Sequence, residues 1–274
     1  MPHPQATIHR MSQLVEPIAT VCFSEVVTEA FLALGMRNYW DGYFAGRAAP
    51  LGPAPAEVVH AVFYNFAEGE VARHIPWVWV RTTPQEAIAI RERSSAMELR
   101  QRTGRLADSP DLVRVADLAT RAALSAPTEG RALYAGLRAL DVPEEPVARL
   151  WHAATLLREH RGDGHNAALL AHSIGGTEAH VLMALRFEMK AEEFSRTHHL
   201  PRAQLADVVD GLRRRGLVDA AGGFTEAGRE IRQRIEDLTD ELAAPVYDVL
   251  SPDELDELVA GLEPIAAAVS ADHD

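Results

Sequence analysis

Residues 200–230 read LPRAQLADVVDGLRRRGLVDAAGGFTEAGRE, and this stretch decides the fold of the C-terminal part of the chain. Apolar residues recur at helical spacing between Pro201 and Arg215, which predicts an amphipathic helix. Gly216 ends that helix, and the apolar pair that follows it predicts a short strand. A turn then brings the chain back in a second strand, before Thr225 caps another helix. The predicted order is therefore helix, β-hairpin, helix.

This order resembles the winged helix-turn-helix of MarR-type regulators, and the phrases RGLV (215–218) and FTEAG (224–228) carry the resemblance. The resemblance implies that the helix beginning at Pro201 is the recognition helix of such a unit. Its candidate DNA-binding residues are Arg202, Arg213, Arg214 and Arg215.

Several features of the sequence disfavour DNA binding. The arginines 213–215 stand at the C-terminal end of the predicted helix, whereas helix-turn-helix proteins usually present N-terminal residues to the bases. Asp207 and Asp210 add negative charge to the same helix, and the predicted wing, DAAGG (219–223), contains no basic residue. The whole chain carries a formal charge of −13, which repels phosphate backbones. We therefore expect no nucleic-acid partner.

Length and composition narrow the class of protein further. The 274 residues fit one large domain or two modest ones. Cys22 is the single cysteine, which excludes an intrachain disulfide and a multi-cysteine metal site. No apolar run approaches the ~20 residues that a membrane span needs, and the N-terminus lacks the pattern of a signal peptide. We expect a cytoplasmic protein with no membrane partner.

The remaining sequence is helical in pattern almost throughout, which predicts an all-α fold with a C-terminal winged helix-turn-helix unit. The stretch APLGPAPAE (49–57) predicts a loop, because prolines and glycines interrupt any helix there. Helix starts are predicted at Thr83–Pro84, at Ser109–Pro110, at Thr128, at Pro143–Pro146 and at Ser251. We divide the chain into an N-terminal helical domain (1–145) and a C-terminal part (146–274).

A faint internal repeat suggests a second, degenerate winged-helix unit near the N-terminus. VHAVFYNFAEGEVARHI (59–75) and LMALRFEMKAEEFSRTH (182–198) share their apolar spacing and three identical pairs. These pairs are Ala61/Ala184, Glu70/Glu193 and Arg73/Arg196. Three identities are close to chance for sequence of this composition.

The most unusual polar stretch is REHRGDGH (158–165), which interrupts an apolar helical pattern on both sides. Six of its eight residues are ionisable, and Gly162 and Gly164 predict a sharp turn between two buried helices. Buried charges must be paired, so we expect four side chains of this turn to converge on a concave pocket. These are His160, Arg161, Asp163 and His165.

The same segment supports acid–base chemistry. Asp163 beside His160 or His165 forms the carboxylate–imidazole pair that general acid–base catalysis uses, so these three are the candidate catalytic residues. Arg158 or Arg161 could clamp an acidic ligand. Two alternatives stay open: a purely structural ion-pair network, and a His/Asp metal site. The metal site is disfavoured because the spacing of His160 and His165 across glycines is not that of HExxH enzymes.

An aromatic segment supplies the other candidate ligand-binding residues. Tyr43 and Arg47 stand one helical turn apart, so they share a face if that segment is helical. Tyr64 and Asn65 belong to the run VFYNF (62–66), in which Asn65 needs a partner if it is buried. We expect these side chains to line a mostly aromatic cleft.

REHRGDGH, YFAGRAAPLGP (43–53) and VFYNF together resemble a family of actinobacterial proteins labelled helix-turn-helix, and the resemblance would cover most of the chain. It implies a fold and the location of a site, without any activity. The positions that carry it are Tyr43, Arg47, Pro50, Gly52, Tyr64, Asn65, Arg158, His160, Arg161, Asp163 and His165.

Three functions follow as hypotheses. The leading one is a small-molecule-binding protein on a winged-helix-derived scaffold, extending to a metal-independent acid–base enzyme. The first alternative is a ligand-responsive winged-helix transcriptional regulator, and the second is a metal-dependent enzyme. No cofactor is expected, because the phosphate-binding motifs GxxxxGK[ST] and GxGxxG and the nucleophile motif GxSxG are absent. The expected partner is a small molecule, with a homodimer left open.

Overall fold

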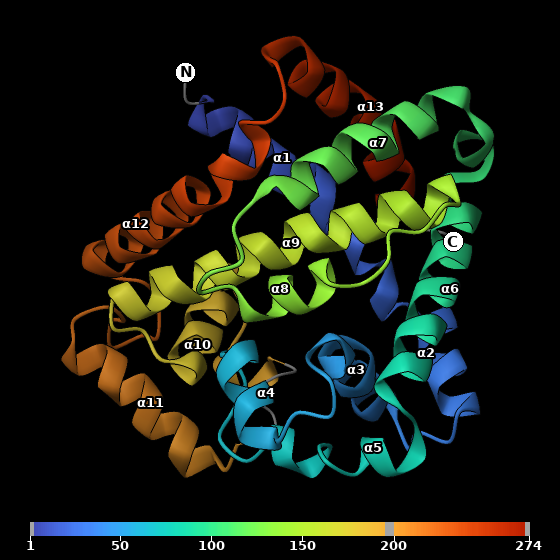
Figure 1. Ribbon diagram of the computed structural model, residues 1–274. Helices are drawn as coiled ribbons and strands as arrows, with labels where there is room; N and C mark the ends of the chain where they lie inside the picture. The colour runs from blue at the N-terminus through green and yellow to red at the C-terminus, as the bar shows by residue number, and fades with distance from the viewer. Residues whose placement is uncertain (1–2, 195–199, 272–274) are drawn as a thin grey trace.

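The computed structural model describes residues 3–194 and 200–271, and within them the chain is all-α, as predicted (Figure 1). Its α-helices are α1 (Gln5–Thr20), α2 (Glu25–Ala33), α3 (Tyr39–Ala48), α4 (Ala56–Phe63), α5 (Val78–Arg81), α6 (Pro84–Thr103), α7 (Pro110–Ser125), α8 (Ala132–Arg138), α9 (Pro146–Ala171), α10 (Gly176–Arg186), α11 (Arg202–Arg214), α12 (Glu226–Ala243) and α13 (Pro252–Ser270). Short 3₁₀ turns join several of them, including η1 (Val21–Phe23), η2 (Ala49–Leu51), η3 (Val71–Arg73) and η5 (Ala191–Glu193).

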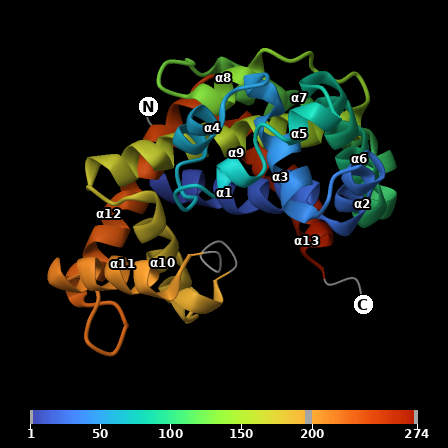
Figure 2. The ribbon, with the colours of Figure 1, turned by 90° about the horizontal axis from the view of Figure 1, so that it is seen from below.

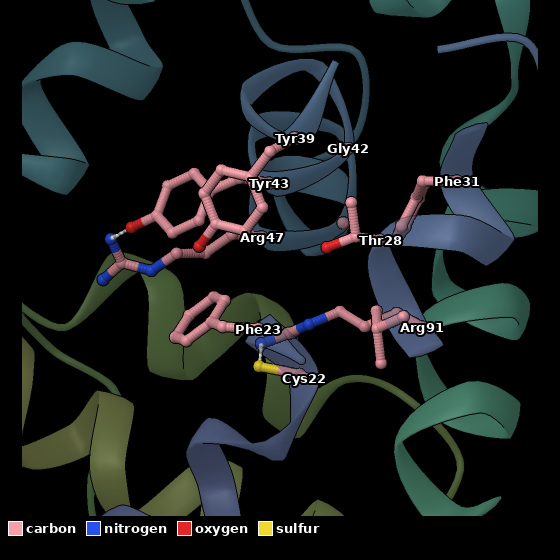
Figure 3. A pocket seen from close by; sticks show the side chains of 11 residues that line it. Cys22, Phe23, Thr28, Phe31, Tyr39, Gly42, Tyr43, Arg47 and Arg91 are labelled. Atoms are coloured by element: carbon pink, nitrogen blue, oxygen red, sulfur yellow. Dashed lines mark hydrogen bonds between the residues drawn. The ribbon is translucent and has the colours of Figure 1, made fainter. Parts of the chain in front are cut away.

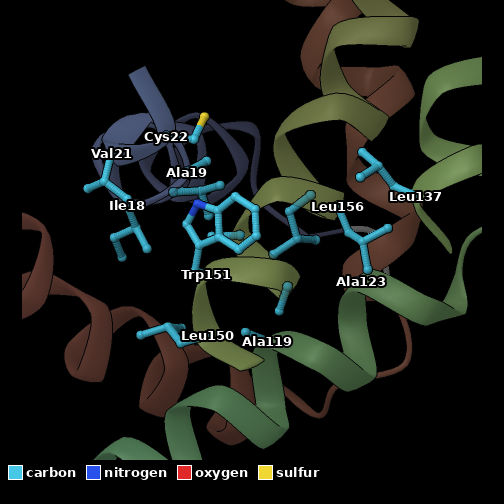
Figure 4. Packing of buried hydrophobic residues seen from close by; sticks show 14 of the residues in the cluster. Ile18, Ala19, Val21, Cys22, Ala119, Ala123, Leu137, Leu150, Trp151 and Leu156 are labelled. Atoms are coloured by element: carbon cyan, nitrogen blue, oxygen red, sulfur yellow. The ribbon is translucent and has the colours of Figure 1, made fainter. Parts of the chain in front are cut away.

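The long helix α9 is the axis of the molecule. It packs against α1, α6, α7, α8 and α12, and Figure 1 shows it crossing the middle of the fold. Glu145 starts it, because the carboxylate accepts a hydrogen bond from the Ala148 N–H at 2.7 Å, and Pro146 occupies the first helical position. Figure 4 shows the Trp151 indole of α9 buried between side chains of α1 and α7.

Two hydrophobic cores lie along this axis. The larger core joins α1–α8, the first half of α9 and α13. The smaller core joins the end of α9 to α10, α11 and α12, and it includes Leu169, Leu182, Leu205, Leu212 and Ile235. Because α9 contributes to both cores, it connects α10, α11 and α12, which we call the C-terminal unit, to the rest of the molecule. The division of the chain between residues 145 and 146 stays a prediction.

Local capping signals place most helix ends where the sequence predicts them. The Thr83 hydroxyl and the Glu86 carboxylate form a reciprocal capping box at the start of α6, and Ser251 forms the same arrangement at α13. The Thr225 hydroxyl accepts the Gly228 N–H at 3.0 Å and starts α12. The helix predicted to begin near Thr128 begins later, at Ala132.

The predicted β-hairpin is reduced to one antiparallel bridge, between Val218 and Phe224, and the described residues contain no strand. The Asp219 N–H donates to the Gly223 carbonyl at 2.8 Å, which closes the turn. A longer ladder cannot form because Thr225, directly after the bridge, already caps α12 while its hydroxyl donates to the Gly216 carbonyl at 2.6 Å.

The pair Arg73/Arg196 of the internal repeat cannot be compared in space, because Arg196 lies outside the described residues. Among the described residues, no helix is long and apolar enough to span a bilayer.

Candidate functional site

The polar segment 158–165 is not a turn: it is the middle of α9, and both of its glycines are helical. The prediction of a sharp turn is therefore wrong. Gly164 is explained by packing instead, because a Cβ atom there would lie 3.0 Å from Arg131 Nη1 and 3.3 Å from Leu242 Cβ. The missing side chain lets the loop before α8 and the end of α12 approach the helix backbone closely.

Since α9 is continuous, its polar residues project in several directions, about 100° apart for successive positions. Glu159 faces α3 and is 2 % exposed. Its carboxylate accepts hydrogen bonds from Arg47 Nη2 at 2.9 Å and Nε at 3.3 Å, and from Arg158 Nη1 at 2.8 Å. Arg158 also reaches α1, where Nε and Nη2 donate to the two carboxylate oxygens of Glu16 at 2.9 and 3.1 Å. A chain of alternating charges thus links α1, α9 and α3.

The charge of Glu159 is strongly stabilised. Burial acts to raise the pKa of Glu159, but the positive charges of Arg47 and Arg158 outweigh it and hold that pKa at about 2. Arg47 in turn donates to the Tyr43 hydroxyl at 3.0 Å, so these two residues share a face of α3 as predicted.

His160 and Asp163 face α8 instead. Asp163 accepts the Tyr134 N–H at 3.0 Å, and the His160 ring meets the Tyr134 ring edge-on with centroids 5.0 Å apart. The guanidinium of Arg131 donates to the His160 carbonyl and, at 2.7 Å, to the Leu242 carbonyl. Burial lowers the pKa of His160 to about 3, with help from the Arg131 charge, so its imidazole is neutral near pH 7.

The buried carboxyl of Asp163 makes a testable pH dependence. Burial raises its pKa to about 6 from an unfolded value of 3.8, so the native state binds the proton more tightly and stability falls as the pH rises from about 4 to about 6. Asp163→Asn keeps the acceptor for Tyr134 and removes this titration. At pH 7.5 we expect the free energy of unfolding of the variant to exceed that of the wild type by up to about 3 kcal/mol. Thermal melts between pH 4 and 8 measure this, and a variant less stable at every pH would contradict it.

Arg161 and His165 face α12. Arg161 Nη2 lies 2.9 Å from an Asp240 carboxylate oxygen and 3.0 Å from one of Glu236, while His165 Nδ1 lies 3.0 Å from the Thr239 hydroxyl. Burial lowers the pKa of His165. These contacts form a polar seam that fixes α12 against the axis helix.

The predicted ligand-binding residues do not share one cleft. Tyr43 and Arg47 line a cavity of about 10 Å³ between α2 and α3, which has room for about one water (Figure 3). The Tyr64 hydroxyl donates to the Ile174 carbonyl at 2.5 Å, and Asn65 lies against Gly176 at the start of α10. Tyr64 and Asn65 therefore join α4 to the C-terminal unit.

The four residues predicted to converge also separate. His160 and Asp163 face α8, whereas Arg161 and His165 face α12, and none of them lines the α2–α3 cavity or a second small cavity between α6 and α9. Within residues 3–194 and 200–271, no three His, Cys, Asp or Glu side chains gather as a group that could hold a metal ion.

Sequence reasoning missed Glu16, Arg91 and Arg131. The partner of each lies far along the chain, so no local pattern marks these residues. The position of Arg91, which is 5 % exposed on the otherwise polar helix α6, could be found only from the fold.

Helix α11 is exposed at one end of the C-terminal unit. Leu205 and Leu212 bury its inner side, and its exposed residues include Arg202, Gln204, Asp207, Asp210 and Arg214. Figure 2 shows α11 and the turn after it at one end of the molecule, away from α2 and α6.

The other two arginines of the predicted DNA-binding set have ion-pair partners. Arg213 pairs with Asp210 at 2.9 Å and Arg215 with Glu178 at 3.0 Å. In the described part of the chain, Arg202 and Arg214 have no such partner.

Comparison with known proteins gives one match, to a protein family. No curated protein and no solved structure matches the chain significantly. The sequence model of a family described as a helix-turn-helix family matches residues 8–274. Because that match spans nearly the whole chain, the protein belongs to this helix-turn-helix family.

Proposed function

We propose that the protein is a helix-turn-helix regulator that binds duplex DNA through the exposed face of α11. The observation that carries this proposal is the pair Arg202 and Arg214, which are exposed at the two ends of α11 and have no ion-pair partner among the described residues. Twelve residues of helix separate them by about 18 Å along the axis and about 120° around it. Positions on two sides of the helix suit contacts to the two phosphate backbones that border the groove.

The distribution of charge supports this orientation. Residues 200–234 contain seven arginines and five carboxylates, although the chain as a whole carries −13. The net negative charge therefore lies in the rest of the chain. The expectation from the sequence that no nucleic acid binds rests on the net charge, on Asp207 and Asp210 of the same helix, on the C-terminal position of arginines 213–215 and on the wing without basic residues. The local excess of arginine bears on the first of these.

We propose that the turn closed by Asp219 and Gly223 is a reduced wing. Its one bridge and its lack of basic residues suit a spacer beside the duplex better than a minor-groove contact. The order α4, η3, α5, α6 resembles α10, η5, α11 apart from the extra short helix α5, and we propose that it is a degenerate copy of the same unit. A homodimer would set two copies of α11 about 34 Å apart, on successive turns of DNA.

Acid–base catalysis is not part of the proposal, because His160, Asp163 and His165 each already hold a structural contact. Ligand response stays a prediction. A ligand larger than one water at Tyr43 and Arg47 requires α2 and α3 to separate.

Fluorescence anisotropy on labelled duplexes, selected from a random-sequence library, tests DNA binding. We expect affinity to fall with salt, because phosphate contacts release counterions. Arg202→Gln and Arg214→Gln should each reduce the slope of log K against log salt by about 1.

The matched control is Arg229→Gln on α12, since Arg229 pairs with Glu226 at 3.0 Å. That variant should keep the wild-type slope. Absence of binding at 50 mM salt, or equal slopes in all variants, would refute the proposed interface.

A further inference from the structure

Arg91 is a buried cation without a carboxylate partner among the described residues. It is 5 % exposed, and its guanidinium lies 5.3 Å from the centre of the Trp151 ring. Its one hydrogen bond to a side chain goes from Nη2 to the Cys22 sulfur at 3.3 Å, as Figure 3 shows. A buried charge without a counter-charge is costly, so the surroundings of Arg91 need an explanation.

Glu159 interacts electrostatically with Arg91 but is not its ion-pair partner among the described residues. Glu159 already accepts hydrogen bonds from both Arg47 and Arg158, and Glu16 is engaged with Arg158 at the surface. Glu92 is the third carboxylate of this region. It lines the same cavity as Arg91 but forms no ion pair with it within the described structure.

Arg91 lies between two small cavities, and it lines both of them together with Gly46. The second cavity, between α6 and α9, has a volume of about 10 Å³ and is also lined by His152 and Thr155. These two residues are 3 % and 2 % exposed, and His152 Nε2 and Thr155 Oγ1 have no hydrogen-bond partner within residues 3–194 and 200–271. A hydroxyl and an imidazole N–H are donors, so the wall of the cavity can offer two donors next to a cation.

We propose that this cavity is a binding site for one halide ion, held by Arg91, His152 and Thr155. The charge and the donors select an anion over a neutral occupant. The volume admits one water-sized sphere, which excludes polyatomic anions such as sulfate and phosphate. Chloride and bromide are the monatomic anions of this class.

Two neighbouring ionisable groups set the conditions for binding. Glu92 lines the same cavity, and burial raises its pKa, so its negative charge would oppose the anion once it ionises. His152 has a pKa lowered to about 4, by burial and by the Arg91 charge, and it stays a neutral donor near pH 7. Glu92→Gln should therefore bind the halide at least as tightly as the wild type.

The test locates the bound halide in the crystal and measures how tightly it binds in solution. Crystals soaked in sodium bromide should show an anomalous peak beside the Arg91 guanidinium. In solution at low salt, the melting temperature of the wild type should rise with sodium bromide more than that of Thr155→Val, because a ligand of the native state stabilises it. Thr155→Val keeps the shape of the side chain but removes its hydroxyl. It should raise the dissociation constant for the halide about tenfold.

Arg91→Gln should abolish the halide-specific rise, whereas Arg93→Gln, which changes an exposed arginine two residues away, should leave it intact. If Arg91→Gln does not fold, the other two variants still test the proposal. Thr155→Val should bind the halide more weakly than the wild type, and Glu92→Gln should bind it at least as tightly. Equal rises in sodium bromide for the wild type and Thr155→Val would overturn the proposal. So would the absence of a bromide peak beside the Arg91 guanidinium.

Discussion

Glu159→Gln is expected to lower the free energy of unfolding by about 3–5 kcal/mol, because it leaves two largely buried arginines without their shared counter-charge. The side chains of Arg47 and Arg158 are 13 % and 21 % exposed, and Glu159 is the carboxylate that joins them. The loss should appear in urea unfolding, and as a fall in melting temperature on the order of 10 °C.

Glu16→Gln is the matched control, since it makes the same chemical change on another partner of Arg158. The Glu16 side chain is 54 % exposed, so water screens its ion pair and the loss should be about 0–1 kcal/mol. Similar losses in the two variants would show that burial does not set the strength of this network.

The Glu159 carboxylate also makes the protein less stable at acid pH. The pKa of Glu159 is about 2 in the native state and 4.5 when unperturbed, so its contribution is complete above about pH 4.5 and is lost as the pH falls toward 2. Asp163 acts in the opposite direction, because its pKa is raised to about 6. Two carboxylates four residues apart on α9 thus respond oppositely to pH, according to which neighbours they face.

Local signals explain how much of this fold the sequence predicts. The caps at Thr83, Thr225 and Ser251 use partners three residues away, and the Tyr43–Arg47 contact spans one helical turn. Such interactions are visible in sequence spacing. The helix-turn-helix unit was predictable for the same reason, because its apolar spacing, its Gly216 stop and its cap are all local.

The candidate site was not predictable in this way. Glu159 meets Arg47, 112 residues earlier, and Asp163 meets Tyr134, 29 residues earlier. A dense group of charges in sequence suggested one shared pocket, but a continuous helix distributes these side chains around its circumference. The prediction of a turn at Gly164 was wrong for a related reason. A glycine allows either a sharp turn or the close packing of other side chains against the backbone, and the sequence does not distinguish these two roles.

Gly228→Ala is expected to unfold the C-terminal unit locally, with a loss of about 3 kcal/mol or more in the stability of that unit. A Cβ atom at this position would lie 2.0 Å from the Leu217 carbonyl oxygen and 3.1 Å from Phe224 Cδ1. That carbonyl accepts the Thr225 N–H at 3.2 Å, so it cannot move away without opening the turn. Hydrogen exchange should become faster across residues 216–228.

Gly211→Ala on α11 is the control, because its Cβ would meet only Arg214 Nη2, at 3.8 Å. Within a helix, alanine is more favourable than glycine by about 1 kcal/mol, so this variant should be as stable as the wild type or more so. The two variants also separate the cores: Gly228→Ala should leave amide protection in α1, α7 and the first half of α9 unchanged, since those helices belong to the larger core. Equal protection at 216–228 in both variants would mean that the close contact with Leu217 relaxes without opening the turn. Loss of protection in α7 as well would mean that the two cores unfold as one cooperative unit through α9.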